Sequence, residues 1–376
     1  MISSGIPYQK NLDGVRGIAI LLVMLTHQHL NSFGWVGVPL FFVLSGFLIT
    51  KILFFENRKG ISIGSKLKNF WMRRILRIFP IYYLYLIVLL VIFLVFNFGP
   101  GLIRGFPYLL SYTYNFYISN TLDFLYLPIV HLWSLSVEEQ FYLFYPFLVL
   151  LLNKKQLQVA IITLIIFSIC FRFFYMDNLR ELYKEDSSLL GEKMYYLTFS
   201  HFDSFLAGAS IIIFKLNRIR TSILNFLLIG SFLLMMISGF FLFMQIHNNE
   251  FCFKCYLKDL GYNFENIKYA WPYIPINLFF FSLILNLVSE KKSVFGSILD
   301  KIFSFSWLVS IGKVSYGMYI IHRGCSYFIS MDRDKFPFLN NNYIFFALYF
   351  GIVYLLAVIS FHLYEKRFLN LKTRFR

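Results

Sequence analysis

Ten apolar segments, each near the length that an α-helix needs to cross a bilayer, constrain this chain most. About 20 apolar residues span the hydrocarbon core of a membrane. Of the 376 residues, 58% are hydrophobic and 14% charged, which leaves too little polar surface to cover a water-soluble domain of this size. We therefore predict a single all-α, polytopic membrane domain over residues 1–376. Its spans are expected at approximately 12–30, 35–55, 78–97, 132–152, 157–176, 195–214, 221–244, 271–289, 304–330 and 343–364.

Loop charge supports an even number of spans. The Lys and Arg excess falls in the loops after the second, fourth, sixth and eighth segments and in the tail, whereas the other loops are nearly neutral. Because cytoplasmic loops carry the basic excess, both termini are predicted to be cytoplasmic. The net charge of +16 is scattered between apolar segments. It therefore favours orientation among membrane lipids, and we expect no nucleic-acid partner.

The N-terminal segment has a second interpretation. Lys10, the apolar run 18–25 and the small-residue pattern 32–34 are compatible with a cleaved secretory signal peptide. We favour retention, because such a peptide has no use for Arg16 and His27 on one helix face.

That first segment carries Asp13, Arg16 and His27 within an apolar run. Ionisable side chains at membrane depth are costly and indicate function by default. Arg16 and His27 are eleven residues apart, which is about three helical turns and roughly 16 Å of rise. One helix face is therefore expected to hold a cation near the cytoplasm and an imidazole deeper in the membrane.

The fourth segment places two adjacent carboxylates, Glu138 and Glu139, inside the membrane. Neighbouring helical residues point about 100° apart, so the two cannot face one point. Glu138 shares a polar stripe with Ser134 and Tyr142. We therefore assign Glu138 to the site and give Glu139 a supporting place.

Arg74 and Arg77 stand at the cytoplasmic mouth of the third segment and share a helix face. They could anchor the helix to lipid headgroups, which is the commoner role. Alternatively, their guanidinium groups could clamp a phosphate or carboxylate.

Weaker signals come from the remaining polar residues. Ser45 lies in a small-residue segment suited to close helix packing. Asp203 lies near the start of the sixth segment, and His322 lies along the ninth. Cys252 and Cys255 form one CxxC, which without a second pair favours a disulfide over zinc. No metal site is predicted.

Five motifs, in this order, resemble the acyltransferase family 3 of integral membrane acyltransferases. They are Leu12-Asp13-Gly14-Val15-Arg16-Gly17-Ile18-Ala19 with His27, Phe42-Val43-Leu44-Ser45-Gly46-Phe47-Leu48, Arg74-Ile75-Leu76-Arg77, Leu132-Trp133-Ser134-Leu135-Ser136-Val137-Glu138-Glu139-Gln140-Phe141-Tyr142, and Ser315-Tyr316-Gly317-Met318-Tyr319-Ile320-Ile321-His322.

The resemblance implies ten membrane helices in a bacterial inner membrane that move an acyl group, usually acetyl, from cytoplasmic acetyl-CoA to a sugar hydroxyl. The acceptor it implies is a cell-surface or lipid-linked glycan such as O-antigen, other lipopolysaccharide or capsule. Some members append an extracytoplasmic hydrolase-like domain. We expect this chain to resemble the stand-alone type. The family often has Arg at the position of His201, so His201 is not carried over as a site residue.

The resulting hypothesis is that Arg16, Arg74 and Arg77 bind the phosphates of CoA or orient its thioester from the cytoplasmic side, while Glu138 orients His27. His27 would either remove the proton of the acceptor hydroxyl or briefly carry the acyl group. One rival is a different membrane acyltransferase with a lipid or protein acceptor. A second is a transporter or flippase of lipid-linked glycans, since buried charges also serve translocation.

Overall fold

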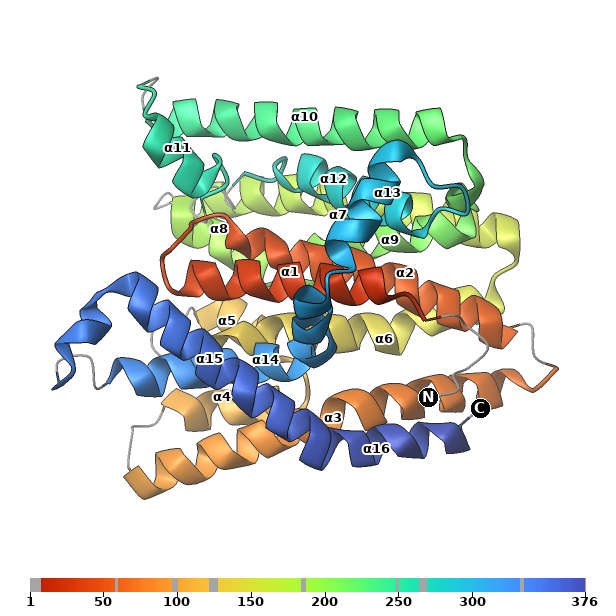
Figure 1. Cartoon of the computed structure of the whole chain (residues 1–376). Coiled ribbons are helices and arrows are strands. Elements are labelled where there is room, and N and C mark those ends of the chain that lie inside the picture. The colour runs from red at the N-terminus through yellow and green to blue at the C-terminus, as the bar shows by residue number, and fades with distance from the viewer. Residues whose placement is uncertain are drawn as a thin grey trace. The chain divides into compact units, whose positions relative to one another are not determined.

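The computed structural model describes residues 8–57, 60–96, 101–121, 128–183, 187–247, 250–263, 269–331 and 335–375. These residues form helices and connecting turns, with no strand among them (Figure 1).

A helix lies in each of the ten predicted segments, so the all-α prediction is confirmed. The helices are α1 (Lys10–His27), α2 (Gly37–Asn57), α3 (Ile63–Phe96), α6 (Trp133–Leu151), α7 (Lys154–Tyr183), α9 (Phe202–Ile213), α10 (Thr221–Ile246), α12 (Tyr273–Val288), α14 (Ser306–Ser330) and α15 (Asn342–Ser360). Among the described residues, five helical segments are long and apolar enough to cross a membrane: 34–57, 63–96, 154–178, 221–246 and 342–374. The chain is therefore a multi-pass membrane protein, and the cytoplasmic placement of its termini stays a prediction.

Shorter helices fill the connections, and counting apolar spans did not predict them. They are α4 (Gly101–Leu110), α5 (Tyr114–Thr121), α8 (Ser187–Tyr195), α11 (Phe253–Asp259), α13 (Val294–Phe303) and α16 (Lys366–Leu371). Each is too short to span the hydrocarbon core, so a search for 20-residue segments passes over them. Taken as one broken segment, α13 and α14 would add a sixth candidate span.

The chain divides into two compact units. Unit 1 comprises Met1–Tyr8, Leu53–Leu150 and Ile311–Arg376, and unit 2 comprises Gln9–Ile52 and Leu151–Ser310. The predicted single domain thus contains two clusters of packed helices, and each is described by itself.

Unit 2 is built from helices that pack closely through small residues. Helix α10 packs along α12, α7 along α9, and α1 against α13 (Figure 1). Where α2 meets α9, Gly46 lies against the carbonyl oxygen of Phe205, and Gly208 lies against that of Val43. A Cβ atom at either glycine would occupy the space of the opposing carbonyl. The two backbones therefore touch directly, as small residues allow in membrane helices.

In unit 1, the long helix α3 packs against α4 and α16. A stack of aromatic rings joins α3 to the turn between α4 and α5: Tyr112 stacks on Tyr82 with ring centroids 4.5 Å apart and on Phe79 at 5.4 Å. Tyr112 has a φ of 53°, in the left-handed region that non-glycine residues seldom adopt. Gln140 of α6 fixes this turn by donating to the Tyr112 carbonyl at 2.8 Å.

We predict that Gly46→Ala and Gly208→Ala will each lower the stability of the folded protein by about 1–3 kcal/mol or more, because a methyl group must push two helix backbones apart. Gly230→Ala is the matched control, since a Cβ there meets nothing within 4 Å inside α10. It should be neutral or stabilising by up to about 1 kcal/mol, from helix propensity. Thermal unfolding in detergent measures all three. Equal midpoints for Gly46→Ala and Gly230→Ala would contradict the close approach.

Candidate functional site

In unit 2, α1 positions three of the predicted residues. Asp13 and Arg16 form an ion pair one turn apart near the start of the helix. Asp13 is buried, and the Arg16 side chain is 19% exposed. The nearest compensation for the Arg16 charge is therefore local, within the same helix.

His27 is the last residue of α1 and is half-buried. The turn after it is held by Asn31, which accepts hydrogen bonds from the Thr26 hydroxyl at 2.5 Å and from the Gly34 amide at 3.0 Å. This turn folds back toward the segment before α12, where the Trp35 indole donates to the Tyr262 carbonyl at 2.7 Å. Arg16 thus lies in the first half of α1 and His27 at its end, and the depth of each in the membrane stays a prediction.

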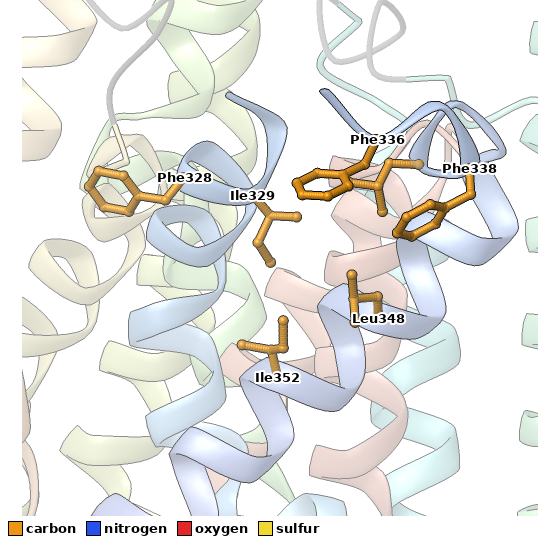
Figure 2. Close-up of a pocket in the computed structure, with 7 residues that line it drawn as sticks. Phe328, Ile329, Phe336, Phe338, Leu348 and Ile352 are labelled. Carbon is orange, nitrogen blue, oxygen red and sulfur yellow. The ribbon is translucent and has the colours of Figure 1, made fainter. Parts of the chain in front are cut away.

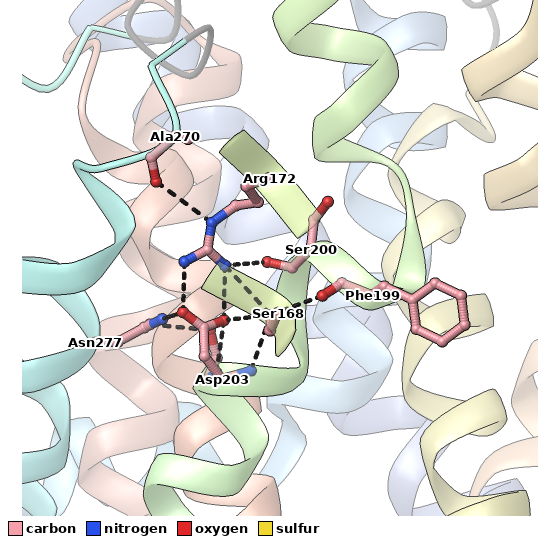
Figure 3. A network of polar contacts seen from close by, with 8 residues as sticks. Ser168, Arg172, Phe199, Ser200, Asp203, Ala270 and Asn277 are labelled. Atoms are coloured by element: carbon pink, nitrogen blue, oxygen red, sulfur yellow. Dashed lines mark hydrogen bonds and ion pairs between the residues drawn. The ribbon is translucent and has the colours of Figure 1, made fainter. Parts of the chain in front are cut away.

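Asp203, at the start of α9, lies in a buried polar network (Figure 3). Its two carboxylate oxygens accept from the two terminal nitrogens of Arg172, at 2.8 Å and 2.7 Å. Asn277 and Ser168 also donate to this carboxylate, at 3.0 Å and 3.2 Å. The carboxylate therefore has partners from α7 and α12.

Arg172 is fully buried, at 0% exposure, and each of its three nitrogens donates at least one hydrogen bond. Its guanidinium donates to the Ser200 carbonyl at 2.7 Å and to the Ala270 carbonyl at 3.3 Å. The group also lies over the Tyr273 ring, 4.8 Å from its centroid, a cation–π arrangement. A bidentate arginine–carboxylate pair with these additional hydrogen bonds is suited to joining α7, α9 and α12.

Sequence reasoning missed Arg172. The signal was present, since an arginine inside the apolar segment 157–176 is as costly as the residues that were singled out. Asp203 was named as a supporting residue, and its partner lies 31 positions away on another helix.

Unit 1 gathers Arg74 with the carboxylates of α6. Arg74 is within electrostatic range of Glu139 and Tyr142, and the Trp71 indole ties α3 to α6 by donating to the Tyr142 carbonyl at 3.1 Å. Oε1 of Glu139 and Nε of Arg74 are buried, and neither has a hydrogen-bond partner among the described residues. Nε of Arg74 can therefore still donate a hydrogen bond, and Oε1 of Glu139 can still accept one, in the interior of unit 1.

Glu138 has a different setting. Its Oε1 accepts a hydrogen bond from the Tyr142 hydroxyl one turn along α6. The predicted polar stripe is thus present in the structure. Of the two carboxylates, however, Glu139 is the one with a buried oxygen that has no partner in the described part of the chain.

One turn before Glu138, at the start of α6, Ser134 joins a buried cluster that includes His322 of α14. The Ser134 hydroxyl lies 2.5 Å from the Tyr319 hydroxyl, and each donates to the His131 carbonyl at 3.1 Å. His131 and His322 pack edge-on, with ring centroids 4.5 Å apart. Their rings contact the backbone of α14: His131 Nε2 is 2.9 Å from the Ile320 carbonyl, and His322 Nδ1 is 2.6 Å from that of Tyr319.

An apolar pocket also lies in unit 1, between α14, α15 and the turn before α15 (Figure 2). Its lining includes Phe328, Ile329, Phe336, Phe338, Leu348 and Ile352. None of these side chains can transfer a proton or bind a phosphate, so the pocket is not the candidate catalytic site.

The structure thus brings the predicted residues together in two groups. Unit 2 holds Asp13, Arg16, His27, Ser45 and Asp203. Unit 1 holds the cations and carboxylates of α3 and α6 with the hydroxyl and imidazole groups near them, namely Arg74, Arg77, Ser134, Glu138, Glu139, Tyr142 and His322. Ser45 is buried in α2 next to Gly46. The orientation of His27 by Glu138 stays a prediction, because the two residues belong to different units.

Removing one partner of the Arg172–Asp203 pair should be far worse than removing both. We predict that Arg172→Met or Asp203→Leu alone lowers stability by about 3–5 kcal/mol, because each leaves a buried charge uncompensated. The double variant should lose much less than the sum of the two. A double-mutant cycle of thermal unfolding in detergent measures the difference, and additive losses would contradict it.

The exposed pair Arg218–Glu290 provides the control, with a separation of 2.8 Å and side chains 64% and 53% exposed. Its double-mutant cycle should give a coupling of about 0–1 kcal/mol, as is usual for solvated ion pairs.

Comparison with known proteins identifies the family of this chain. The family model described as an acyltransferase domain matches residues 9–362. A peptidoglycan O-acetyltransferase, OatA, of Listeria monocytogenes is 28% identical over 333 residues, which cover 84% of this chain and 49% of that protein. An O-acetyltransferase, OatA, of Staphylococcus aureus is 34% identical over 201 residues, which cover 48% of this chain and 33% of that protein.

This chain spans about half the length of the curated relatives it matches over most of its residues. No solved structure matches it. The family match covers all five motifs singled out in the sequence, from the first helix to His322. The protein therefore belongs to the acyltransferase family 3 of membrane proteins.

Proposed function

We propose that this protein is a membrane-bound O-acyltransferase that moves an acyl group, most simply acetyl, from cytoplasmic acyl-CoA to a hydroxyl of a cell-surface or lipid-linked glycan. Its proposed location is the inner membrane of a bacterium. Family membership supports the class of reaction, while the donor and the residue roles are inferred from the site and the acceptor from the motifs and the relatives.

One observation carries the donor assignment. Arg74 and Arg77 form no ion pair with any carboxylate of the described residues, whereas Arg16, Arg73 and Arg172 each do. Glu139 and Glu365 are within electrostatic range of Arg74 and Arg77, respectively, yet leave the guanidinium groups unpaired. Uncommitted guanidinium forks suit the phosphates of CoA, to which they bind by charge-assisted hydrogen bonds. When bound, the donor supplies a thioester-activated acyl group.

Two groups of the chain are suited to proton transfer, one on the acceptor side and one on the donor side. A neutral imidazole at His27 could accept a hydroxyl proton, since its ordinary pKa lies near neutrality. His27 could instead carry the acyl group briefly. Glu139, with a buried and unpartnered oxygen beside Arg74, could receive or hold a proton on the donor side.

The class of acceptor is a proposal, based on the motifs and on the names of the relatives. The Listeria relative is named for peptidoglycan. The resemblance of the motifs implies O-antigen, other lipopolysaccharide or capsule as the acceptor. All of these are glycans with free hydroxyl groups. Mass spectrometry of each glycan, from cells with and without this protein, would show which one gains acyl groups.

The rival functions predict different products. A lipid or protein acyltransferase would leave the glycans unchanged and acylate another acceptor. A flippase would consume no thioester. In proteoliposomes supplied with acetyl-CoA and acceptor, release of free CoA thiol is therefore expected, and its absence would reject acyl transfer from this donor.

We predict that His27→Ala will lower the rate of transfer by about 10²–10⁴-fold, the usual contribution of a general base. Protein level in the membrane should be unchanged. His29→Asn is the matched control, because His29 is exposed, lies two residues further on and has a φ of 56°, which Asn tolerates. Wild-type acetylation in the His27→Ala variant would refute its role.

We predict that substitutions of the two adjacent carboxylates, Glu138 and Glu139, will have different effects on kcat. Glu139→Gln removes a negative charge near Arg74, so binding of an anionic donor should stay equal or strengthen while kcat falls at least tenfold. Glu138→Gln keeps an acceptor for the Tyr142 hydroxyl, and its effect on kcat should be smaller. Steady-state measurement of kcat and of KM for acetyl-CoA distinguishes them. A raised KM with an unchanged kcat for Glu139→Gln would contradict the assignment.

A further inference from the structure

The last described residues of the chain, α16 and the short helix η9 (Lys372–Arg374), lie beyond residues 9–362, which the family model matches. Both pack against α3 within unit 1 (Figure 1). The family match therefore assigns this C-terminal segment no role, although it lies along the helix that carries Arg74 and Arg77.

Specific contacts hold the segment to α3. Arg73 pairs with Glu56 at 2.9 Å and uses the same nitrogen to donate to the Phe375 carbonyl at 2.7 Å. Two residues before α16, the Tyr364 hydroxyl donates to the Pro80 carbonyl at 3.4 Å. One nitrogen of Arg73 thus fixes the segment, whereas neither Arg74 nor Arg77 forms an ion pair or hydrogen bond with it in the described part of the chain.

This attachment packs η9, which begins at Lys372, against α3, the helix that carries Arg74 and Arg77. Lys372 is half-buried and within electrostatic range of Arg77, Arg74 and Arg73, all of the same sign. Among the described residues, no carboxylate forms an ion pair with Lys372, Arg74 or Arg77. Bringing like charges together in a partly desolvated place is unfavourable. A bound anion would remove that cost.

Lipid headgroups are the other source of phosphate near such cations. Basic side chains that snorkel to headgroups keep their charged ends at the surface. Lys366, Arg367 and Arg374 of the same segment are exposed and suited to this role. Arg74, in contrast, has a buried Nε and interacts with Tyr142 and Glu139 of α6, in the interior of unit 1.

We infer that Lys372 completes, with Arg74 and Arg77, an anion site that binds a phosphate group of the acyl donor. This inference rests on the proposed function, because it takes CoA as the source of the phosphate. The C-terminal segment is then part of the donor site, positioned by Arg73.

The test is the affinity for CoA of the full chain in nanodiscs of phosphatidylcholine alone, measured by calorimetry. Lys372→Gln should raise the Kd about tenfold, which corresponds to about 1.4 kcal/mol, because it removes one charge-assisted hydrogen bond to the phosphate. Lys372→Arg should keep most of the affinity. The matched control Lys366→Gln, which removes the same charge from an exposed position six residues earlier, should change the Kd less than about twofold.

Two further arms separate the possible failures. If Arg77→Gln weakens CoA binding but Lys372→Gln behaves as Lys366→Gln does, the role of Lys372 is wrong and the donor assignment stands. If the wild-type protein binds no CoA, the donor assignment itself falls, and the role of Lys372 with it. If Lys372→Gln leaves CoA binding intact but removes the thermal stabilisation given by phosphatidylglycerol nanodiscs, the lysine binds a lipid headgroup and the inference is overturned.

Discussion

A charge that leaves water must find compensation, and this constraint accounts for the polar architecture of both units. In unit 2 the compensation is complete: Arg172 meets the carboxylate of Asp203, two backbone carbonyls and the face of Tyr273. The charge is paired and all three guanidinium nitrogens donate hydrogen bonds, so the network can stabilise helix packing and has little capacity left for a ligand. Its completeness argues for a structural role.

Unit 1 handles its charges in the opposite way. Arg73 is compensated by Glu56 and by a carbonyl of the C-terminal segment, while Arg74 next to it is left without an ion-pair partner among the described residues. Adjacent arginines thus have different tasks, one holding the protein together and one available to an anion. This division suits the CoA donor that we propose, because CoA carries phosphates.

The sequence was sufficient for the helices and for most of the charged positions. A helix lies in each of the ten predicted hydrophobic segments, because a helix satisfies its own backbone in lipid, although five of the described helical segments are long and apolar enough to cross a membrane. Pairings between helices were not predictable. Arg172 and Asp203 are 31 residues apart with no shared motif. In the sequence, Lys372 is one of several basic residues of the tail, and nothing there indicates that α16 and η9 pack against α3. The choice between Glu138 and Glu139 likewise depends on which neighbouring helix each one faces.

The contact of Gly46 and Gly208 limits how this protein can change. At most crowded positions a larger residue can be accommodated by trimming a neighbouring side chain. Here the obstacle on each side is a backbone carbonyl, of Phe205 or of Val43, which every amino acid carries. No second substitution at the obstructing residue can therefore restore the lost space. The crossing of α2 and α9 is in that sense closed to compensatory mutation, and variation in unit 2 has to arise elsewhere.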